Sequence, residues 1–203
     1  MKTIFKIMKL IILPGNAKRS NEQWALDAEA VFSDSGTDVQ QQRYSHWDTG
    51  GKLIDFDVEL KKLVEAVKNE SGYVIFGKSA GALLAIYGVY KGELKPERCV
   101  FVGLPLAWAS EKAVPLQVWL EKFDIPTIIL QQSEDPEASC SEVQQILTEL
   151  KKENMRAVEI PGNDHKYGDF YLFKGAVISF ILSKENAKEN KDVQVTGAEL
   201  KLK

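Results

Sequence analysis

Ser79 lies in Gly77-Lys78-Ser79-Ala80-Gly81, and this G-x-S-x-G pattern is typical of a serine that acts as a nucleophile. An apolar run over residues 73–76 precedes the pattern, and a helical pattern over 80–90 follows it. A sharp turn between strand and helix would expose the serine hydroxyl, and the flanking glycines carry no side chains that would collide with neighbouring elements. The pentapeptide alone is a weak signal, but its place in the chain predicts a nucleophilic Ser79.

The chain has two histidines, His46 and His165, so candidates for a catalytic base are few. His165 follows the last apolar run of the chain, in Pro161-Gly162-Asn163-Asp164-His165. An isolated histidine is more often a loop or capping residue. The position of His165 downstream of the serine, at the end of a different strand, nevertheless favours a general base that removes the serine proton.

Asp135 is the preferred acid because it follows another apolar run, 127–130, and precedes Pro136, which keeps it extended. Such a carboxylate would accept the imidazole N–H, select its tautomer and stabilise the imidazolium. Asp164 is adjacent to His165 in sequence, and a local cap is its simpler role. The alternatives to Asp135 are Glu134, Asp164 and Asp169.

Acyl transfer at Ser79 would also require backbone N–H groups that stabilise an oxyanion. The N–H of Ala80, directly after the serine, is expected to be one donor. The second is expected from the loop after the first apolar run, from Asn16 or Gly15, although this loop could also be a plain turn. The candidate substrate-binding residues are His46, Trp108 and Trp119. A surface turn is the simpler role for His46, and packing is the simpler role for the tryptophans.

Lys78, beside the serine, is expected to be solvated. The same lysine completes a second pattern, G-x-x-x-x-G-K-S over residues 72–79, which resembles a phosphate-binding loop. Its four middle residues are Tyr-Val-Ile-Phe, and these must form the strand before the helix rather than a loop around phosphates. Nucleotide binding is therefore disfavoured, and the serine chemistry requires neither a cofactor nor a metal.

The composition predicts one soluble domain. The 203 residues are 44% hydrophobic and 27% charged, which is enough for one sizeable core. A formal net charge of -3 offers no basic field for nucleic acid. Cys99 and Cys140 make no disulfide framework, which favours the reducing cytoplasm. Lysines interrupt residues 1–13, so no signal peptide is predicted, and no apolar run approaches the roughly 18 residues that span a membrane.

Short apolar runs alternate with helical patterns along residues 1–183. The runs cover residues 10–13, 39–44, 73–76, 99–102, 127–130 and 157–160. This alternation predicts a single doubly wound α/β domain with a mostly parallel sheet buried on both faces. Helices are expected to start at capping boxes over 20–23 and 139–142, one helix is expected within 107–124, and a last helix presents Phe170 through Ile181. A polar loop is expected over 45–52, and residues 184–203 read as a polar tail.

A serine, an acid and a histidine in this chain order, each after a strand, resemble the α/β-hydrolase family over residues 10–183. The resemblance is to small, nearly lidless members, dienelactone-hydrolase-like or retinoblastoma-binding-protein-9-like. It departs from the family in two places: a His-Gly pair is missing before the first loop, and Gln131-Gln132 replaces His-Gly before the acid. The resemblance implies a Ser-His-Asp triad that cleaves a small ester, thioester or related acyl substrate through an acyl-enzyme. The alternative is a catalytically weak or inactive hydrolase-fold binding protein.

Overall fold

A computed structural model of the chain describes residues 9–183. These residues form a six-stranded sheet in the order β2-β1-β3-β4-β5-β6, in which every pair of neighbouring strands is parallel. The strands are β1 (Lys9–Leu13), β2 (Asp38–Gln41), β3 (Tyr73–Lys78), β4 (Arg98–Val102), β5 (Thr127–Gln132) and β6 (Met155–Ile160). The predicted doubly wound α/β domain is confirmed, with strand bounds within a few residues of the apolar runs.

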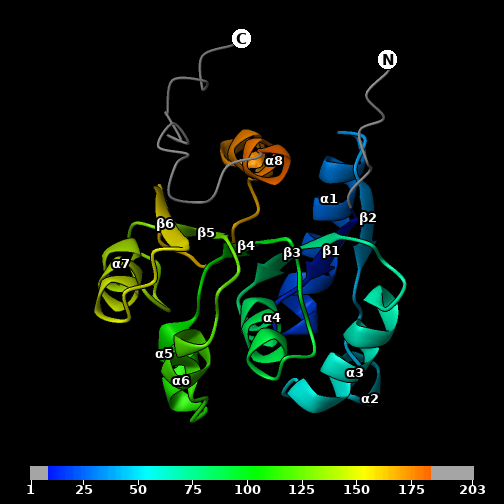
Figure 1. Cartoon of the computed structure of the whole chain (residues 1–203), viewed down its shortest axis with the longest axis horizontal. Coiled ribbons are helices and arrows are strands. Elements are labelled where there is room, and N and C mark those ends of the chain that lie inside the picture. Colours follow the sequence, from blue (N-terminus) through cyan, green and yellow to red (C-terminus); the bar gives the residue numbers. More distant parts are fainter. Residues whose placement is uncertain (1–8, 184–203) are drawn as a thin grey trace.

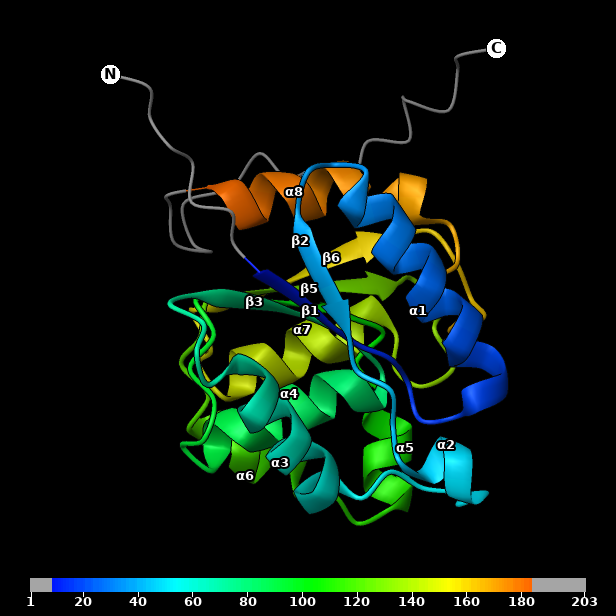
Figure 2. The same ribbon diagram turned by 90° about the vertical axis from the view of Figure 1, so that its right-hand side faces the viewer.

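Helices cover both faces of the sheet, as Figures 1 and 2 show. They are α1 (Lys18–Ser33), α2 (His46–Thr49), α3 (Phe56–Val67), α4 (Ala80–Tyr90), α5 (Leu106–Glu111), α6 (Leu116–Glu121), α7 (Cys140–Glu149), the 3₁₀ turn η1 (Phe170–Leu172) and α8 (Lys174–Leu182). α1 and α8 lie on one face, where Phe76 and Leu130 join the cluster around Trp24. The other face, with α3, α4, α6 and α7, buries Ile75 and Ile129.

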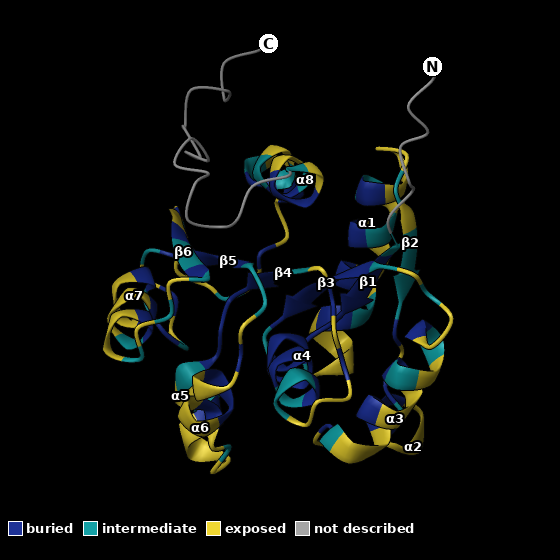
Figure 3. Cartoon of the chain, in the orientation of Figure 1, coloured by how far each residue is buried: buried dark blue, intermediate teal, exposed yellow. Residues whose placement is uncertain are grey.

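Burial on both faces explains why the strands read as continuous apolar runs rather than as alternating ones. Figure 3 shows the central strands buried, together with most of α4. α4 has buried residues on all sides, since it packs on β3 and also contacts α3 and α6. This central helix follows the strand that carries the proposed nucleophile, so the elbow between them is held by the core.

Two predicted helix starts have different outcomes. The capping box over residues 139–142 is confirmed: the Ser139 hydroxyl accepts from the Glu142 N–H, and the Glu142 carboxylate accepts from the Ser139 N–H. The helix start predicted over residues 20–23 is wrong, because α1 already begins at Lys18. Asn21 is instead buried inside the helix, where its amide donates to the Ala17 carbonyl at 2.8 Å.

Three other local predictions also need correction. The single helix expected within residues 107–124 is two short helices, α5 and α6, because Ala113 takes a left-handed conformation (φ 53°) and Pro115 precedes α6. The polar loop over 45–52 contains the short helix α2. The last helix is divided into η1 and α8, with Phe173 between them. The polar tail predicted over 184–203 lies outside the described residues.

None of the helices within residues 9–183 has the length and apolar character that crossing a membrane requires.

Parallel strands bring their carboxyl ends to one edge of the sheet, and the loops that leave this edge carry the predicted site residues. The strand order reverses between β1 and β3. The strand that follows β1 in sequence, β2, lies on one side of it, whereas β4, β5 and β6 extend the sheet in the opposite direction from β3. Ligands of open α/β sheets bind at such a switch point. Ser79 directly follows β3, and Gly15 and Asn16 follow β1, so both lie beside this point.

Candidate active site

Ser79 occupies a strained turn between β3 and α4. Its backbone has φ 51° and ψ −120°, and its N–H donates to the Val102 carbonyl at 3.0 Å. A non-glycine residue in such a conformation costs on the order of 1–3 kcal/mol and persists only where its surroundings hold it. The two motif glycines are part of those surroundings. A Cβ added at Gly77 would lie 2.9 Å from the Ala82 nitrogen, and one at Gly81 would lie 2.1 Å from the Leu13 carbonyl oxygen.

His165 bridges Ser79 and Asp135. Its Nε2 lies 3.0 Å from the Ser79 Oγ, and its Nδ1 lies 2.9 and 2.8 Å from the two Asp135 carboxylate oxygens. The Asp135 carboxylate can only accept in its charged form, so Nδ1 donates and Nε2 is left to accept the serine proton. The imidazole is 19% exposed, whereas the carboxylate is fully buried. The structure thus brings together three side chains that are up to 86 residues apart.

Two of the other acidic candidates, Asp164 and Asp169, have local roles. Asp164 accepts from the Lys166 N–H at 3.0 Å and from the Gln132 amide at 3.1 Å. Asp169 caps the turn η1 through the Tyr171 N–H. Among the hydrogen bonds of residues 9–183, only Asp135 contributes a carboxylate to the His165 ring.

Tyr167 is a further member of the site that the sequence analysis did not identify. Its hydroxyl donates to the Asp135 carboxylate and accepts from the Gln132 N–H at 2.9 Å, while its ring packs edge-on against the His165 ring. Burial opposes charge on Asp135, but the hydrogen bonds from His165, Tyr167 and the Glu137 N–H outweigh it and hold the pKa of Asp135 below its usual value. Only the position of Tyr167, two residues after the histidine, could have indicated this role.

The two glutamines that replace His-Gly organise the loops after β5 and β6. The Gln131 side chain accepts from the Leu104 N–H at 2.8 Å and donates to the Ala138 carbonyl at 2.6 Å. The Gln132 side-chain oxygen accepts from the N–H groups of Asp164 and His165 at 2.9 and 3.1 Å. Both side chains are buried. They satisfy backbone groups of three loops at the site, and Gln132 holds the backbone that carries the histidine.

Gly103, after β4, leaves room for the histidine loop. It has φ 63°, and a Cβ there would lie 2.5 Å from the Tyr167 ring and 3.0 Å from the His165 Cε1. Both the conformation and the space therefore require glycine.

The loop after β1 passes directly over the elbow. The Leu13 and Pro14 carbonyl oxygens would lie 2.1 and 2.7 Å from a Cβ at Gly81. Ala80 is the first residue of α4, where backbone N–H groups have no partner within the helix. Among the hydrogen bonds of residues 9–183, none has the Gly15 or Asn16 N–H as its donor. Neither amide is therefore committed to an acceptor within the described part of the chain.

The candidate substrate-binding residues lie in packed surroundings. His46 is buried, stacks on Tyr44 and places its Nε2 2.8 Å from the Asn16 carbonyl oxygen. Trp119 is buried in an aromatic cluster, 4.8 Å from the Tyr87 ring. Trp108 is partly buried against the core on the α4 face of the sheet. Packing accounts for the burial of both tryptophans.

Lys78 is not solvated, contrary to the expectation from its charge. It is only 3% exposed, and its Nζ lies over the Trp24 ring at 5.1 Å. The alternation of β3 explains this, because Lys78 points to the same face as Phe76, where α1 covers the sheet. Burial lowers the pKa of Lys78 to about 8, although the charges of Asp164 and Asp135 partly oppose this.

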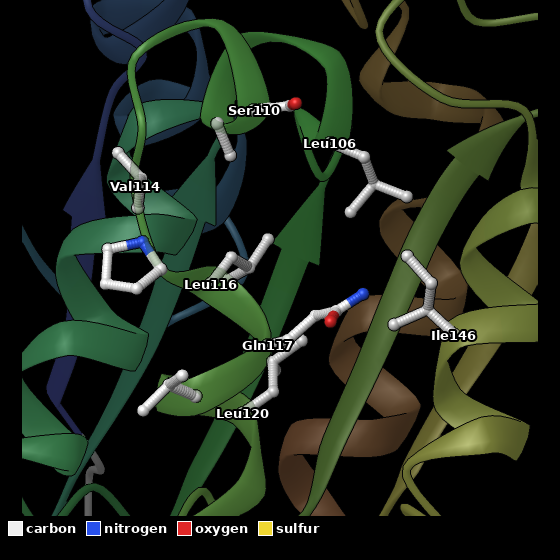
Figure 4. A pocket seen from close by; sticks show the side chains of 10 residues that line it. Leu106, Ser110, Val114, Leu116, Gln117, Leu120 and Ile146 are labelled. Carbon is white, nitrogen blue, oxygen red and sulfur yellow. The ribbon is translucent and has the colours of Figure 1, made fainter.

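An apolar pocket of about 310 Å³ lies between α5, α6 and α7 (Figure 4). Much of its lining comes from Leu106, Leu116, Leu120 and Ile146. The side chains of Ser79, Asp135 and His165 do not line this pocket.

The segment over 72–79 does not form a phosphate-binding loop, because residues 73–78 are strand β3. Within residues 9–183, no group of three or more His, Cys, Asp or Glu side chains is arranged to hold a metal ion.

No protein-family model and no curated protein matches the chain. A candidate hydrolase of the α/β superfamily from Xanthomonas campestris is similar in structure, with a TM-score of 0.64 and 17% identity over 86% of this chain and 98% of that one. An esterase from Pyrococcus furiosus gives a TM-score of 0.66 at 15% identity, over 87% and 82% of the two chains. An uncharacterized protein from Bacillus cereus gives 0.66 at 21% identity over 89% of this chain, which spans 61% of that protein. The topology and these likenesses agree with the resemblance seen in the sequence: the chain has the α/β-hydrolase fold.

Proposed function

We propose that this protein is a serine hydrolase that cleaves a small carboxylic ester, thioester or related acyl compound. The observation that carries the proposal is the continuous hydrogen-bonded chain from Ser79 through His165 to the buried Asp135. Similar solved structures include an esterase and a candidate hydrolase, which supports the same class of reaction.

In the first half of the reaction, the Ser79 Oγ attacks the acyl carbon while its proton passes to the His165 Nε2. The carbonyl oxygen becomes an oxyanion, which the N–H groups of Ala80 and Asn16, or of Gly15, stabilise. Collapse of this intermediate breaks the bond to the alcohol or thiol, and His165 returns the proton to that leaving group. Asp135 stabilises the imidazolium that exists between these two proton transfers.

In the second half, His165 removes a proton from water, and the hydroxide oxygen attacks the acyl-enzyme. The bond to the Ser79 Oγ then breaks, the serine recovers its proton from His165, and the carboxylic acid leaves. The segment between β4 and β5 contains the two short helices α5 and α6. These helices are too small to form a large lid over the site. A small substrate in open contact with water is therefore proposed rather than a lipid interface.

Covalent labelling with a fluorophosphonate, together with hydrolysis of p-nitrophenyl acetate, tests the proposal. Ser79→Ala should abolish labelling and lower hydrolysis at least about a thousandfold, whereas Ser33→Ala, at an exposed position of α1, should leave both unchanged. His165→Ala should also lose turnover. Equal labelling of Ser79→Ala and wild type would refute the assignment, and an absence of turnover in the wild type would favour a binding protein.

A further inference from the structure

Asn16 is held by four hydrogen bonds from one neighbouring segment, which runs from β2 to α3. Its side-chain amide donates to the Lys52 carbonyl at 2.9 Å and accepts from the Ile54 N–H at 2.8 Å. Its backbone carbonyl accepts from the His46 Nε2 at 2.8 Å and from the Trp47 Nε1 at 2.7 Å. A plain turn requires none of these contacts, so this residue is held far more firmly than its loop alone would demand.

The same segment also holds the residue at the start of the loop. The Tyr44 hydroxyl donates to the Pro14 carbonyl at 2.7 Å. Hydrogen bonds from the segment thus take up the backbone carbonyls of Pro14 and Asn16, while the N–H groups of Gly15 and Asn16 donate to no acceptor among residues 9–183. The loop passes within contact distance of Gly81, two residues after the nucleophile.

His46 can donate a hydrogen bond to the Asn16 carbonyl only when its Nε2 carries a proton. The Asn16 carbonyl accepts and cannot donate, so the His46 Nε2 must carry the proton. Its Nδ1 is then an acceptor, and this buried atom has no hydrogen-bond partner within residues 9–183. A buried acceptor without a partner is costly, so the protein tolerates a local loss in order to keep the Nε2 contact to the loop.

From these contacts we infer that His46 and Trp47 are positioning residues. They hold the loop so that the backbone N–H of Asn16 serves as the second oxyanion donor. The inference rests on the proposed function and explains how a loop without the family's His-Gly pair can supply that donor. Donors stabilise an oxyanion well only when they are oriented before the reaction begins. The two side chains touch the loop and not the reacting atoms, so they act through Asn16.

His46→Phe and Trp47→Phe test the inference, because each keeps an aromatic ring and removes the N–H that reaches the Asn16 carbonyl. Each should lower kcat for p-nitrophenyl acetate about tenfold with little change in KM, and the double variant should approach the roughly hundredfold loss expected for one missing oxyanion donor. The affinity for a small alkyl boronic acid, which becomes tetrahedral and anionic on Ser79, should fall in parallel with kcat/KM. A purely structural role would not produce that parallel.

His46→Gln is the rescue variant, because its amide nitrogen lies as many bonds from the backbone as the His46 Nε2, and it should retain most of the activity. Tyr73→Phe is the matched control, because it removes a hydroxyl that accepts from the Lys95 N–H at 2.9 Å, at the end of β3 farthest from Ser79, and it should keep the wild-type kcat. Assays are run well below the melting temperature of every variant, and Trp47→Phe stands alone if His46→Phe does not fold. Wild-type kcat and boronate affinity in the folded variants would overturn this inference alone, whereas a wild type without Ser79-dependent labelling or hydrolysis would overturn the proposed function and this inference with it.

Discussion

Replacing Lys78 with Met should stabilise the protein near neutral pH, although it removes a charge beside the proposed nucleophile. Met keeps an unbranched apolar stem against Trp24 and removes the buried ammonium group. Burial lowers the pKa of Lys78 from 10.5 to about 8, and each pKa unit corresponds to about 1.4 kcal/mol. The charged lysine therefore costs the folded state about 3 kcal/mol. The variant also loses the contact between the ammonium and the Trp24 ring, which costs up to about 2 kcal/mol and offsets part of this gain. The expected net gain in the free energy of unfolding at pH 7 is about 1–3 kcal/mol.

The gain should also depend on pH in a definite direction. Below pH 8, Lys78 is charged in both the folded and the unfolded state, so the full cost is present. Between pH 8 and 10.5 the unfolded state binds more protons than the folded state, so the wild type gains stability relative to Lys78→Met as pH rises. The difference between the two proteins should therefore shrink over this range.

Urea unfolding at pH 7 and at pH 9.5 measures both effects. Lys68→Met is the matched control, because the Lys68 side chain is 52% exposed and its replacement should change the free energy of unfolding by no more than about 0.5 kcal/mol. A Lys78→Met protein that is less stable than wild type at pH 7, by an amount that does not change with pH, would refute the reasoning. The buried ammonium would then be a net source of stability.

Three further substitutions, one of them a control, test the packing and the electrostatics of the protein. Gly81→Ala would place a Cβ 2.1 Å from a backbone oxygen of β1, so soluble expression and thermal melting should show a protein that is largely unfolded. Gly175→Ala lies in the exposed first turn of α8, where the added Cβ would have no described atom within 4 Å, and it should instead raise stability by up to about 1 kcal/mol. Tyr167→Phe removes a hydrogen-bond donor to Asp135 and should raise the pKa of that carboxyl. The lowered pKa stabilises the folded state above about pH 4, so the free energy of unfolding at pH 7 should fall. Urea unfolding from pH 7 to pH 3 measures the difference in free energy of unfolding between Tyr167→Phe and wild type. This difference should shrink as Asp135 becomes protonated at the acidic end of the range. A difference that stays constant over the whole range would contradict the role of the hydroxyl.

Local sequence pattern predicted most of the sheet, because strands buried on both faces leave uninterrupted apolar runs. It was less successful wherever one residue decided a boundary. Ala113, in a left-handed conformation, divides the segment after β4 into two helices, and nothing in its residue type signals this. The helix start at Lys18 likewise has no side-chain cap that a pattern could detect.

The chain by itself determined the α/β fold and placed Ser79, Asp135 and His165 after three strands whose carboxyl ends share one edge. Only the tertiary structure decided which carboxylate meets the imidazole, that Tyr167 holds that carboxylate, and that the Lys78 ammonium lies over the Trp24 ring. The physical reason is range. Strand and helix patterns arise from neighbours along the chain, whereas these contacts join residues from 30 to more than 80 positions apart, and the packing of the whole sheet sets their distances.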